Sequence, residues 1–566
     1  MRKEDIKETP IWGLFEKGRN YHRMKNYYTD TDRNYRFYGG DQWDGAKLDG
    51  VEPVQKNFIK PIVKYKVAVI HDNLYSSVFS SQNYENREFR KQAEHVCEMI
   101  NNRVARIWEK DKMDFKLRRV TKDAAINGEG IIYVNYDKEN QMPLNEIIDK
   151  TEIYYGNEND DDIQEQPYIL LTKRMPVSNA VEFALNHGMS EADTEYIIGD
   201  NDTFEQPGDA AKEEVDNMVT IVYKFYKMNG TVHFSIATRW VEISKDKDMG
   251  IKLYPIAHFN WEEIKGSARG EGEVKNLIAN QIEVNKTEMR RVLTVKQQAY
   301  PQKVVNINKI VNADAVNRVG VTIKTNDQTV DDIKKIVGVL TPAQMSPDVK
   351  LLQDDLINMS RELAGAGEAA TGQTDPEQAS GRAILAVQQA QRAPMTEQRE
   401  SCKAFIEDLD KIYMEYFIAY SDNGINLEET VTDPDTGEEI IQIVNVPQVT
   451  LQQLQASVKV DITPKSVYDR FAQEQTIENL LLQGFFSAQR IGELEAYANA
   501  LDDDSVAPKQ KILEIIEDIK DRQQKIAQIQ AQAQIMQQRA QQFLMGDIES
   551  QAQQMADAQA QVQAGI

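Results

Sequence analysis

The sequence predicts an α+β fold that is predominantly helical. In the middle of the chain, apolar residues recur at three- and four-residue spacing over long stretches, which is the period of an amphipathic helix. The stretch after Pro508 is almost free of Gly and Pro, so it also favours helix. Between Thr151 and Ile243 the period shifts toward two, which predicts strands.

Composition narrows the class of protein. The chain has 566 residues, 41% of them hydrophobic, with five Trp and 23 Tyr, which is enough for several domains with real cores. The N-terminal stretch MRKEDIKETPIWGLF lacks the apolar region of a signal peptide, and no stretch is long enough to span a bilayer. Cys97 and Cys402 lie in helical patterns far apart, so we expect ordinary buried thiols in a reducing cytoplasm.

The N-terminal region predicts helices that lead into one strand. Residues 35–43 (YRFYGGDQW) form a turn-containing unit. The helical segments predicted after it are Asn57–Ser80, Asn86–Lys110 and Lys116–Ile126. The run Gly128-Glu129-Gly130 ends the last helix, and a strand is predicted at Ile131–Tyr136.

The next region predicts a β-hairpin and an acidic loop. Met228-Asn229-Gly230 separates the β-rich runs Val219–Lys227 and Thr231–Trp240, and Asn-Gly favours a tight turn because both residues tolerate positive φ. Glu158–Asp162 (ENDDD) lacks the ligand spacing of an EF-hand, so we interpret it as a solvated loop rather than a cation site. Asp502–Asp504 is interpreted in the same way, as a break between helices.

The stretch 269–421 predicts two rods joined by a small β tip. Helices are expected over Gly272–Gln298 and Pro347–Leu363, with short β-like runs at Lys303–Ile307 and Val319–Lys324 between them. The Gly/Ala-rich loop Ala364–Ser380 then opens a helix that is expected to continue unbroken past Tyr420. Such an arrangement suits a lever or a channel wall better than a catalytic scaffold.

The C-terminal region predicts a strand at Val458–Pro464 and helices after it, the first starting near Tyr468. A thin coiled-coil-like stripe follows, made of Ile512, Ile516, Ile519, Ile526, Ile529, Ala533, Met536, Ala540 and Phe543. From Lys509 to Gly546 it would span about 55 Å at ~1.5 Å per residue. Such a helix needs partners to bury its stripe. A disordered Gln-rich tail remains the alternative, most of all after Gly546.

No constellation of catalytic residues is recognisable. Six scattered His form no HExxH or Cys/His metal spacing, and no Ser stands in a G-x-S-x-G elbow. Residues 367–374 (GEAATGQT) match a P-loop at both Gly and at the final Thr, but Gln373 stands where the phosphate-binding Lys is needed. We therefore expect neither an enzyme nor a cofactor nor a metal.

Several short motifs resemble one family. They are Arg269–Val274 (RGEGEV), the Gln281/Asn285 spacing, Asp375–Ile384 (DPEQASGRAI), the strand at Val458–Pro464, and a Y-x-G-x-Q-W segment from Tyr38 to Trp43. With the order of elements, they resemble the portal proteins of tailed bacteriophages over most of residues 1–510. The likeness is greatest to the type found in phages with long non-contractile tails.

This resemblance implies a ring, usually of twelve subunits, at one capsid vertex, through which DNA is packaged and later ejected. The implied regions are a wing (1–268), a first stem helix (269–298), a clip (299–344), a second stem helix (345–364), a tunnel loop (365–381), a long wing helix with a β segment (382–466), a crown (467–506) and a C-terminal helical barrel or tail (507–566).

The resemblance also implies sites and partners. The tunnel-loop residues expected near DNA are Glu368, Thr371, Gln373 and Thr374, and weaker stem candidates are Lys275, Lys286 and Lys350. The clip residues expected to dock partners are Asn306, Asn308, Asn312, Asn317, Asn326, Asp327 and Asp331. The expected partners are further copies of the chain, the terminase large subunit that powers packaging, major capsid and scaffolding proteins, head-completion or adaptor proteins, and double-stranded DNA bound without sequence preference. No membrane partner is expected, and the protein would be assembled in the host cytoplasm and end in the virion.

The net charge of −24 argues against a broad DNA-gripping surface, because such surfaces concentrate Lys and Arg. In a DNA conduit, an acidic lining would repel the duplex and let it slide. The alternative is that acidity only keeps the assembly soluble. Two other classes stay open: an enzyme such as a nuclease or nucleotide hydrolase, and a capsid scaffolding or shell protein without a channel.

Overall fold

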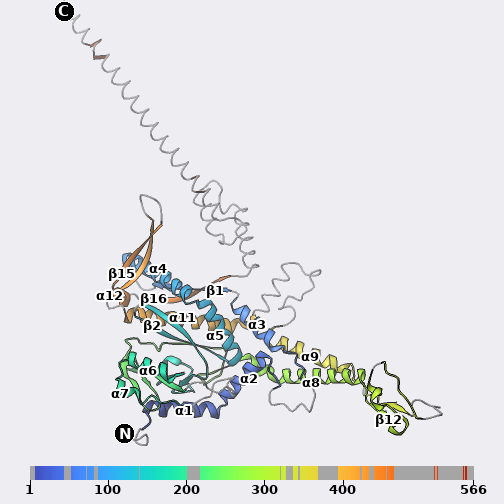
Figure 1. Ribbon diagram of the computed structural model, residues 1–566. Coiled ribbons are helices and arrows are strands. Elements are labelled where there is room, and N and C mark those ends of the chain that lie inside the picture. Colours follow the sequence, from blue (N-terminus) through green and yellow to red (C-terminus); the bar gives the residue numbers. More distant parts are fainter. Residues whose placement is uncertain are drawn as a thin grey trace, which may run out of the picture. The chain divides into compact units, whose positions relative to one another are not determined.

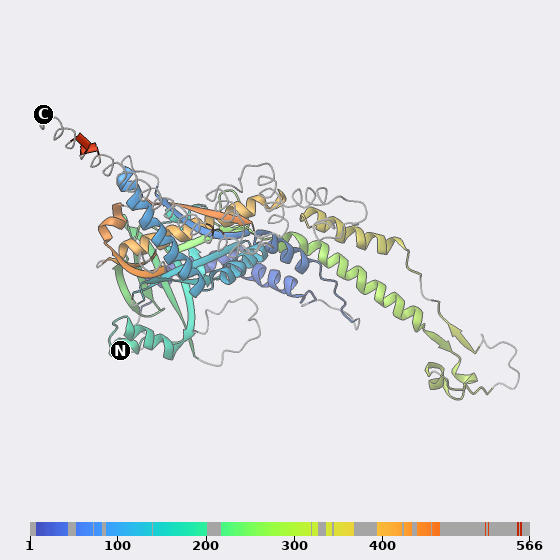
Figure 2. The ribbon, with the colours of Figure 1, turned by 90° about the horizontal axis from the view of Figure 1, so that it is seen from above.

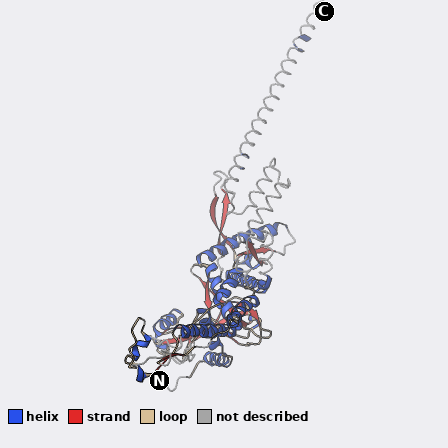
Figure 3. Ribbon diagram, turned by 90° about the vertical axis from the view of Figure 1, so that its right-hand side faces the viewer, coloured by secondary structure: helices blue, strands red, loops and turns tan. Residues whose placement is uncertain are grey.

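The computed structural model divides into two compact units, residues 1–463 and 464–566. It describes residues 7–43, 52–71, 73–81, 87–138, 140–200, 217–318, 320–326, 336–341, 344–366, 393–420, 424–432, 439–453 and 456–464, with isolated positions 516, 519, 552–553 and 555–556. The fold below is therefore that of the first unit. It mixes helices and sheets, as predicted (Figures 1 and 3).

The elements follow one another in the order of Figure 1. The α-helices are α1 (Pro10–Met24), α2 (Tyr27–Gly39), α3 (Ile59–Ile70), α4 (Arg87–Lys110), α5 (Met113–Asn127), α6 (Val177–Asn186), α7 (Glu191–Thr194), α8 (Glu273–Ala299), α9 (Asp348–Leu363), α11 (Thr396–Ala419) and α12 (Gln448–Gln453). Short 3-10 turns are η2 (Ile163–Glu165), η4 (Ile307–Lys309), η5 (Ala313–Asn317) and η7 (Ala393–Met395).

The strands form small antiparallel sheets. Their bounds are β1 (Asn73–Ser81), β2 (Glu129–Asp137), β3 (Met142–Ile148), β4 (Ile153–Tyr155), β5 (Ile169–Pro176), β6 (Met218–Met228), β7 (Thr231–Ala237), β8 (Glu242–Asp248), β9 (Ile256–Asn260), β10 (Glu262–Glu263), β11 (Gly270–Glu271), β12 (Lys303–Val305), β13 (Val337–Val339), β14 (Ile425–Thr432), β15 (Glu439–Val446) and β16 (Ala456–Pro464). The sheet orders are β4-β5-β6-β7-β8, β3-β2-β9, β1-β16, β10-β11, β12-β13 and β14-β15.

The five-stranded sheet has helices on both faces. Trp12 and Phe15 of α1 pack with Leu170 and Val222 on one face, and Ala180 of α6 belongs to a second cluster on the other. The predicted hairpin is confirmed as β6 and β7, joined by a two-residue turn in which Asn229 has φ 54° and Gly230 has φ 88°. The helix α6 lies in a stretch for which only strands were predicted, although Val177, Ala180, Val181 and Ala184 have helical spacing.

The largest core surrounds the three-stranded sheet. Strand β2 lies in the centre of that sheet, and α5 and α11 pack against it and its neighbour β9. The apolar side chains of α3, α4 and the first half of α8 join the same core. The helix α5 ends at Gly128, whose φ of 101° permits the sharp entry into β2. This core therefore anchors the start of α8.

The two predicted rods are present as α8 and α9. They lie side by side, and the segment 300–341 with β12 and β13 forms a tip at their far end (Figures 1 and 2). Just before α9, the Ser346 hydroxyl accepts a hydrogen bond from the Asp348 N–H at 3.3 Å. The tip has its own small core of Ile310, Val316 and Ile336. No described helix is long and apolar enough to cross a membrane.

Three secondary-structure predictions are wrong. The second half of the helix predicted over Asn57–Ser80 is strand β1, because this segment pairs with β16, nearly 400 residues later in the chain. In the tip, β12 pairs with β13, whereas the described residues 320–324 of the β-like run predicted at Val319–Lys324 form no strand; the isolated bridge Ile310–Thr325 comes just after them. The helix predicted to run past Tyr420 is interrupted at η7, and α11 ends at Ala419.

Other predicted elements are confirmed, including the strand at Val458–Pro464 as β16 and helices α4 and α5. Cys97 and Cys402 are buried free thiols. The tunnel loop, the start of the long wing helix, the helix starting near Tyr468, the Asp502–Asp504 break and nearly all of the crown and barrel lie outside the described residues.

Candidate functional site

The RGEGEV segment lies where α8 leaves the core, and Arg269 is its centre. This side chain is only 1% exposed. Its Nε and Nη2 donate to the two carboxylate oxygens of Glu158 at 2.9 and 3.0 Å, and its Nη1 donates to Glu129 at 3.2 Å. Nη2 also donates to Nε2 of His22 at 2.8 Å, so that nitrogen carries no proton. The backbone carbonyls of Lys150 and Ile153 accept the remaining bonds.

The charges of this cluster stabilise one another. Burial opposes ionisation of Glu158, but the attraction of Arg269 and the hydrogen bonds that Arg269 donates outweigh it and lower the pKa of Glu158 to about 2. Arg269 and Lys150 hold the pKa of Glu129 well below its usual range in the same way. Burial, together with the Arg269 charge, lowers the pKa of His22 to about 4. At neutral pH the cluster is therefore a cation between two carboxylates with a neutral imidazole.

The glycines of the same segment allow backbones to touch. A Cβ on Gly270 would lie 2.5 Å from the carbonyl oxygen of Gly128, and a Cβ on Gly272 would lie 2.5 Å from that of Ile126. Real Cβ atoms do not approach so closely, so the C-terminus of α5 and the N-terminus of α8 cross only because side chains are absent. Glu273, the next residue, forms a buried ion pair with Lys66 of α3, with Nζ 2.5 Å from Oε2.

The Gln281/Asn285 spacing fastens α8 to the Y-x-G-x-Q-W segment. Both side chains are buried on one face of α8. Gln281 Oε1 accepts from the N–H of Phe58 at 3.0 Å, and Asn285 Oδ1 accepts from the N–H of Lys56 at 3.0 Å. Asn285 Nδ2 donates to Gln42 Oε1 at 2.5 Å. Three of the motifs that carry the resemblance, the RGEGEV segment, the Gln281/Asn285 pair and the Y-x-G-x-Q-W segment, therefore lie along the start of α8.

Farther out, the contact between α8 and α9 is largely polar. Gln353 of α9 is fully buried; its Oε1 accepts from Arg291 at 2.6 Å and its Nε2 donates to Glu288 at 2.7 Å. Nearer the N-terminus of α8, the side-chain amide of Asn280 donates a hydrogen bond to the hydroxyl of Ser360 on α9 at 3.0 Å. The apolar part of this contact is small, with Ile357 as its buried member on α9.

The opposite side of α9 carries apolar side chains with no cover in the described part of the chain. They are Leu351, Leu352, Met359 and Leu363, exposed by 66%, 56%, 60% and 75%. Large apolar side chains gathered on one helix mark an interaction surface. This α9 apolar face is the feature of the first unit that most needs a partner.

The three stem lysines do not gather at one point. Lys275 pairs with Glu271 at 3.0 Å and Lys286 with Glu283 at 2.8 Å, both on exposed helix surface. Lys350 is exposed at the start of α9, with no side-chain partner among the described residues. Two of the three lysines are therefore already paired with a neighbouring Glu of the same helix or of the residues just before it.

The clip asparagines divide into two groups. Asn306 and Asn312 hold the tip in shape: Asn306 accepts from the N–H of Asn308, and Asn312 bridges to the backbone of Thr322 and Lys324. Asn308, Asn317 and Asn326 are exposed. Asp327, Asp331 and the tunnel-loop residues Glu368, Thr371, Gln373 and Thr374 lie outside the described residues.

Sequence reasoning missed the apolar surface of the tip, which the structure exposes beside these asparagines. Its members are Tyr300, Val304, Ile307, Val311, Val321, Ile323, Val339 and Leu340, with Ile307 75% exposed. It also missed the Arg269 cluster, because the ENDDD run was interpreted as solvated while Glu158 is bound inside. The available signal in the sequence was the presence of Arg269 in the RGEGEV motif.

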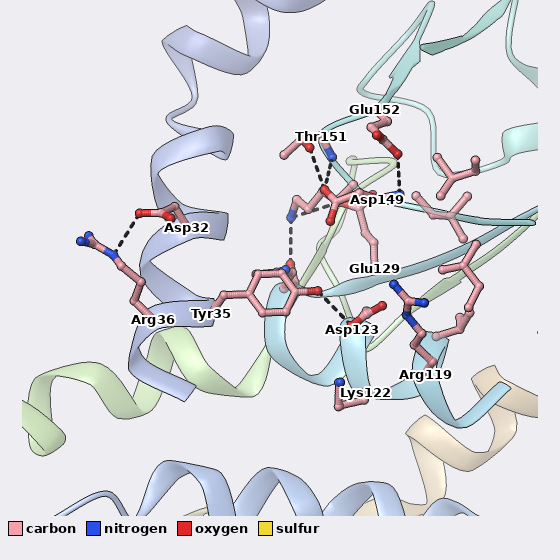
Figure 4. Close-up of a pocket in the computed structure, with 16 residues that line it drawn as sticks. Asp32, Tyr35, Arg36, Arg119, Lys122, Asp123, Glu129, Asp149, Thr151 and Glu152 are labelled. Carbon is pink, nitrogen blue, oxygen red and sulfur yellow. Dashed lines mark hydrogen bonds and ion pairs between the residues drawn. The ribbon is translucent and has the colours of Figure 1, made fainter. Parts of the chain in front are cut away.

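One cavity in the described part of the chain is lined by many charged side chains. This cavity has a volume of about 620 Å³ and lies between α2, α5 and the turn after β3. Figure 4 shows Tyr35 pointing at Asp123, and its hydroxyl donates a hydrogen bond to the Asp123 carboxylate at 2.9 Å. Burial and the charge of Asp149 raise the pKa of Glu152 on its far wall to about 7. The cavity mixes acidic and basic side chains, and no group of His, Cys, Asp and Glu in the described residues is arranged to hold a metal ion.

A helix pair with an uncovered apolar face and a small apolar tip defines a structural component of an assembly. A family model described as Phage P22-like portal protein matches residues 18–565. A comparison with curated proteins finds no match. The chain belongs to the P22-like family of phage portal proteins.

The family match confirms the portal resemblance at the level of the family, and portal proteins are structural components of phages. It does not support the narrower likeness to phages with long non-contractile tails. The C-terminal barrel also stays a prediction.

Proposed function

We propose that copies of this chain form a closed ring at one capsid vertex and that DNA enters and leaves through its channel. The observation that carries the proposal is the α9 apolar face. Each leucine or methionine buried there would contribute about 1.5–3 kcal/mol, so four such side chains per contact favour association of identical helix pairs. Twelve subunits, the number usual in the portals that the sequence resembles, is the proposed size.

The tip is proposed as the clip that docks the terminase large subunit and later the head-completion or adaptor proteins. Its exposed apolar side chains support this role, because they would be covered by a partner at little cost in polar desolvation. We propose Ile307 and Val311 as contact residues, with Asn308, Asn317 and Asn326 beside them supplying hydrogen bonds. Asp327 and Asp331 complete the proposed clip surface.

For the DNA path, the proposal rests on the resemblance rather than on described contacts. The tunnel loop with Glu368, Thr371, Gln373 and Thr374 would approach the duplex, and Lys350 is the stem lysine best placed for a phosphate because it is not already paired. Shortening residues 366–379 should lower DNA packaging or retention and leave oligomerisation unchanged. Normal DNA content in mature particles would contradict a role for this loop.

The remaining proposed partners are the proteins that would surround the ring at a capsid vertex. The wing (1–268 with 382–466) would contact major capsid and scaffolding proteins, and the crown and barrel (467–566) would point into the capsid. The subunits would assemble in the host cytoplasm and remain in the virion. The net charge of −24 supports a channel that repels the duplex and lets it slide.

The proposal is tested by imaging the purified protein by negative-stain electron microscopy and by sedimentation at micromolar concentration. Wild type should give rings with a central hole. The double variant Leu352→Glu/Met359→Glu should give single subunits, because each contact would have to bury two introduced charges. Met24→Glu, which places the same charge on an equally exposed apolar site of α1, is the matched control and should keep the rings.

The second candidate, a scaffolding or shell protein without a channel, predicts another image. Polyhedral shells or filaments in place of rings would favour it. A stable single wild-type subunit with the α9 face uncovered would overturn the ring proposal itself.

A further inference from the structure

A buried acid lies in the middle of α11, on the side that packs into the core. Asp410 is fully buried. Neither of its carboxylate oxygens has a hydrogen-bond partner among the described residues, and the described part of the chain offers it no ion pair. An ionised carboxylate in that position would cost several kcal/mol, roughly, because the nearby Ser77 hydroxyl can replace only a small part of its hydration. Burial therefore favours the neutral acid.

The groups that face Asp410 are polar or acidic. On its own helix, Glu407 and Tyr413 stand one turn before and after it, and Ser77 of β1 lies near its carboxyl group. Beyond Tyr413 lies Asp111, whose charge is already taken by Lys116 at 2.5 Å. Burial raises the pKa of Asp410 from 3.8 to about 7; the Glu407 charge adds to this and Ser77 opposes it.

The strand next to Asp410, β1, pairs with the strand that ends at the boundary of the first unit. Strand β1 packs on α11 and α4 and pairs with β16 in a two-stranded sheet. On α4, Asn101 bonds both backbone groups of Phe79, accepting from its N–H at 2.7 Å. Strand β16 runs to Pro464, and the first compact unit ends at Thr463. Strand β16 is thus the last element of the first unit in the described part of the chain.

We propose that Asp410 is a proton-controlled lock on the β1–β16 sheet: the neutral acid lets β1 pack on α11, and ionisation weakens that packing. The lock sets how firmly the chain is anchored where the second unit starts. It needs no ligand, and it does not depend on the proposed portal function. The lock responds to pH in the range between the ordinary pKa of an aspartate and neutral pH.

The test is amide hydrogen exchange of the full-length protein from pH 5 to 8, corrected for the intrinsic rate. Between pH 4 and 7 the closed state binds one proton more than the opened state, so opening becomes easier as pH rises. Residues 73–81 and 456–464 should lose protection by about tenfold per pH unit up to pH 7 and level off above it. Asp410→Asn, which keeps the shape and removes the proton, should abolish this slope.

Two further variants keep the test sharp. Asp408→Asn, an exposed acid on the same helix, should retain the wild-type slope. Glu407→Gln removes the neighbouring charge, so the levelling point should move to lower pH while the sheet stays folded. A flat wild-type profile, or an unchanged slope in Asp410→Asn, would overturn the proposal. If Asp410→Asn does not fold, the Glu407→Gln variant decides the matter. The proposal is then overturned if the pH at which protection levels off is the same in Glu407→Gln as in the wild type.

Discussion

Arg269 and Glu129, 140 residues apart, form an ion pair in which neither side chain reaches solvent. The guanidinium also holds Glu158 and His22, so four segments that are distant in the sequence meet at the N-terminus of α8. Together with the Lys66–Glu273 ion pair and the contacts of Gln281 and Asn285, this cluster fixes the point where α8 leaves the core.

The first prediction follows from this cluster. Arg269→Met should lower the free energy of unfolding by about 3–5 kcal/mol, because it leaves Glu158 buried without its cation and Glu129 with Lys150 alone. Lys275→Met, which removes an exposed helix pair on α8, should cost at most about 1 kcal/mol. Urea midpoints of the two variants measure the difference. Equal midpoints would show that the cluster does not hold α8.

A second prediction concerns acid. Because the pKa of His22 is lowered from 6.5 to about 4, the unfolded chain binds one proton more than the folded chain between these values, and stability falls as pH falls. His22→Gln should remove this loss, so the difference in urea midpoint between wild type and variant should change between pH 7 and pH 4.5.

The comparison with the variant is needed because Asp410 and Glu152, with raised pKa values, change stability in the opposite direction over the same range. If the difference between wild type and His22→Gln stays constant with pH, the neutral state assigned to this imidazole is wrong.

Gly128 supplies the third prediction. Its φ is 101°, and a Cβ there would lie 2.3 Å from the carbonyl oxygen of Gly270. Gly128→Ala should therefore reduce the yield of folded protein severely, since both the turn and the close crossing of backbones would be lost. The matched control is Gly13→Ala in the open interior of α1, which should be neutral or stabilising by up to about 1 kcal/mol. Thermal melts of the soluble fractions compare them.

The fourth prediction concerns the tip. Ile307→Asp should leave the ring intact, because this side chain is exposed, and should weaken binding of the purified terminase large subunit by about tenfold or more if the tip is its docking surface. Asn308→Ala, at the next residue, should have a smaller effect. Both effects are measured as the affinity of the terminase large subunit in solution for rings immobilised on a surface. Unaltered binding by Ile307→Asp would remove the tip from the proposed interface.

Local patterns predicted most helices and the hairpin because their signals lie within the elements. Apolar spacing marked α8 and α9, and Asn229-Gly230 fixed the turn between β6 and β7. Strand β1 was misassigned because Leu74 and Val78 also fit a helical period, and only its distant partner β16 decides the matter.

The candidate site was less predictable than the fold. The contacts of Arg269 join residues 22, 129, 158 and 269, and no local pattern records that these positions meet. The motif was visible in the sequence, but its role as a buried ionic centre was not. The apolar tip was hidden for another reason: short runs of Val and Ile suggest strand interiors, whereas here many of them face outward.

The small core of the tip has a practical consequence. With Ile310, Val316 and Ile336 as its buried cluster, this segment retains little of its own stability away from α8 and α9. A protease added to the isolated protein should cut between residues 300 and 341 before it cuts the body, and a bound partner should block that cleavage. Resistance of the tip to cleavage would then report that a partner is bound there.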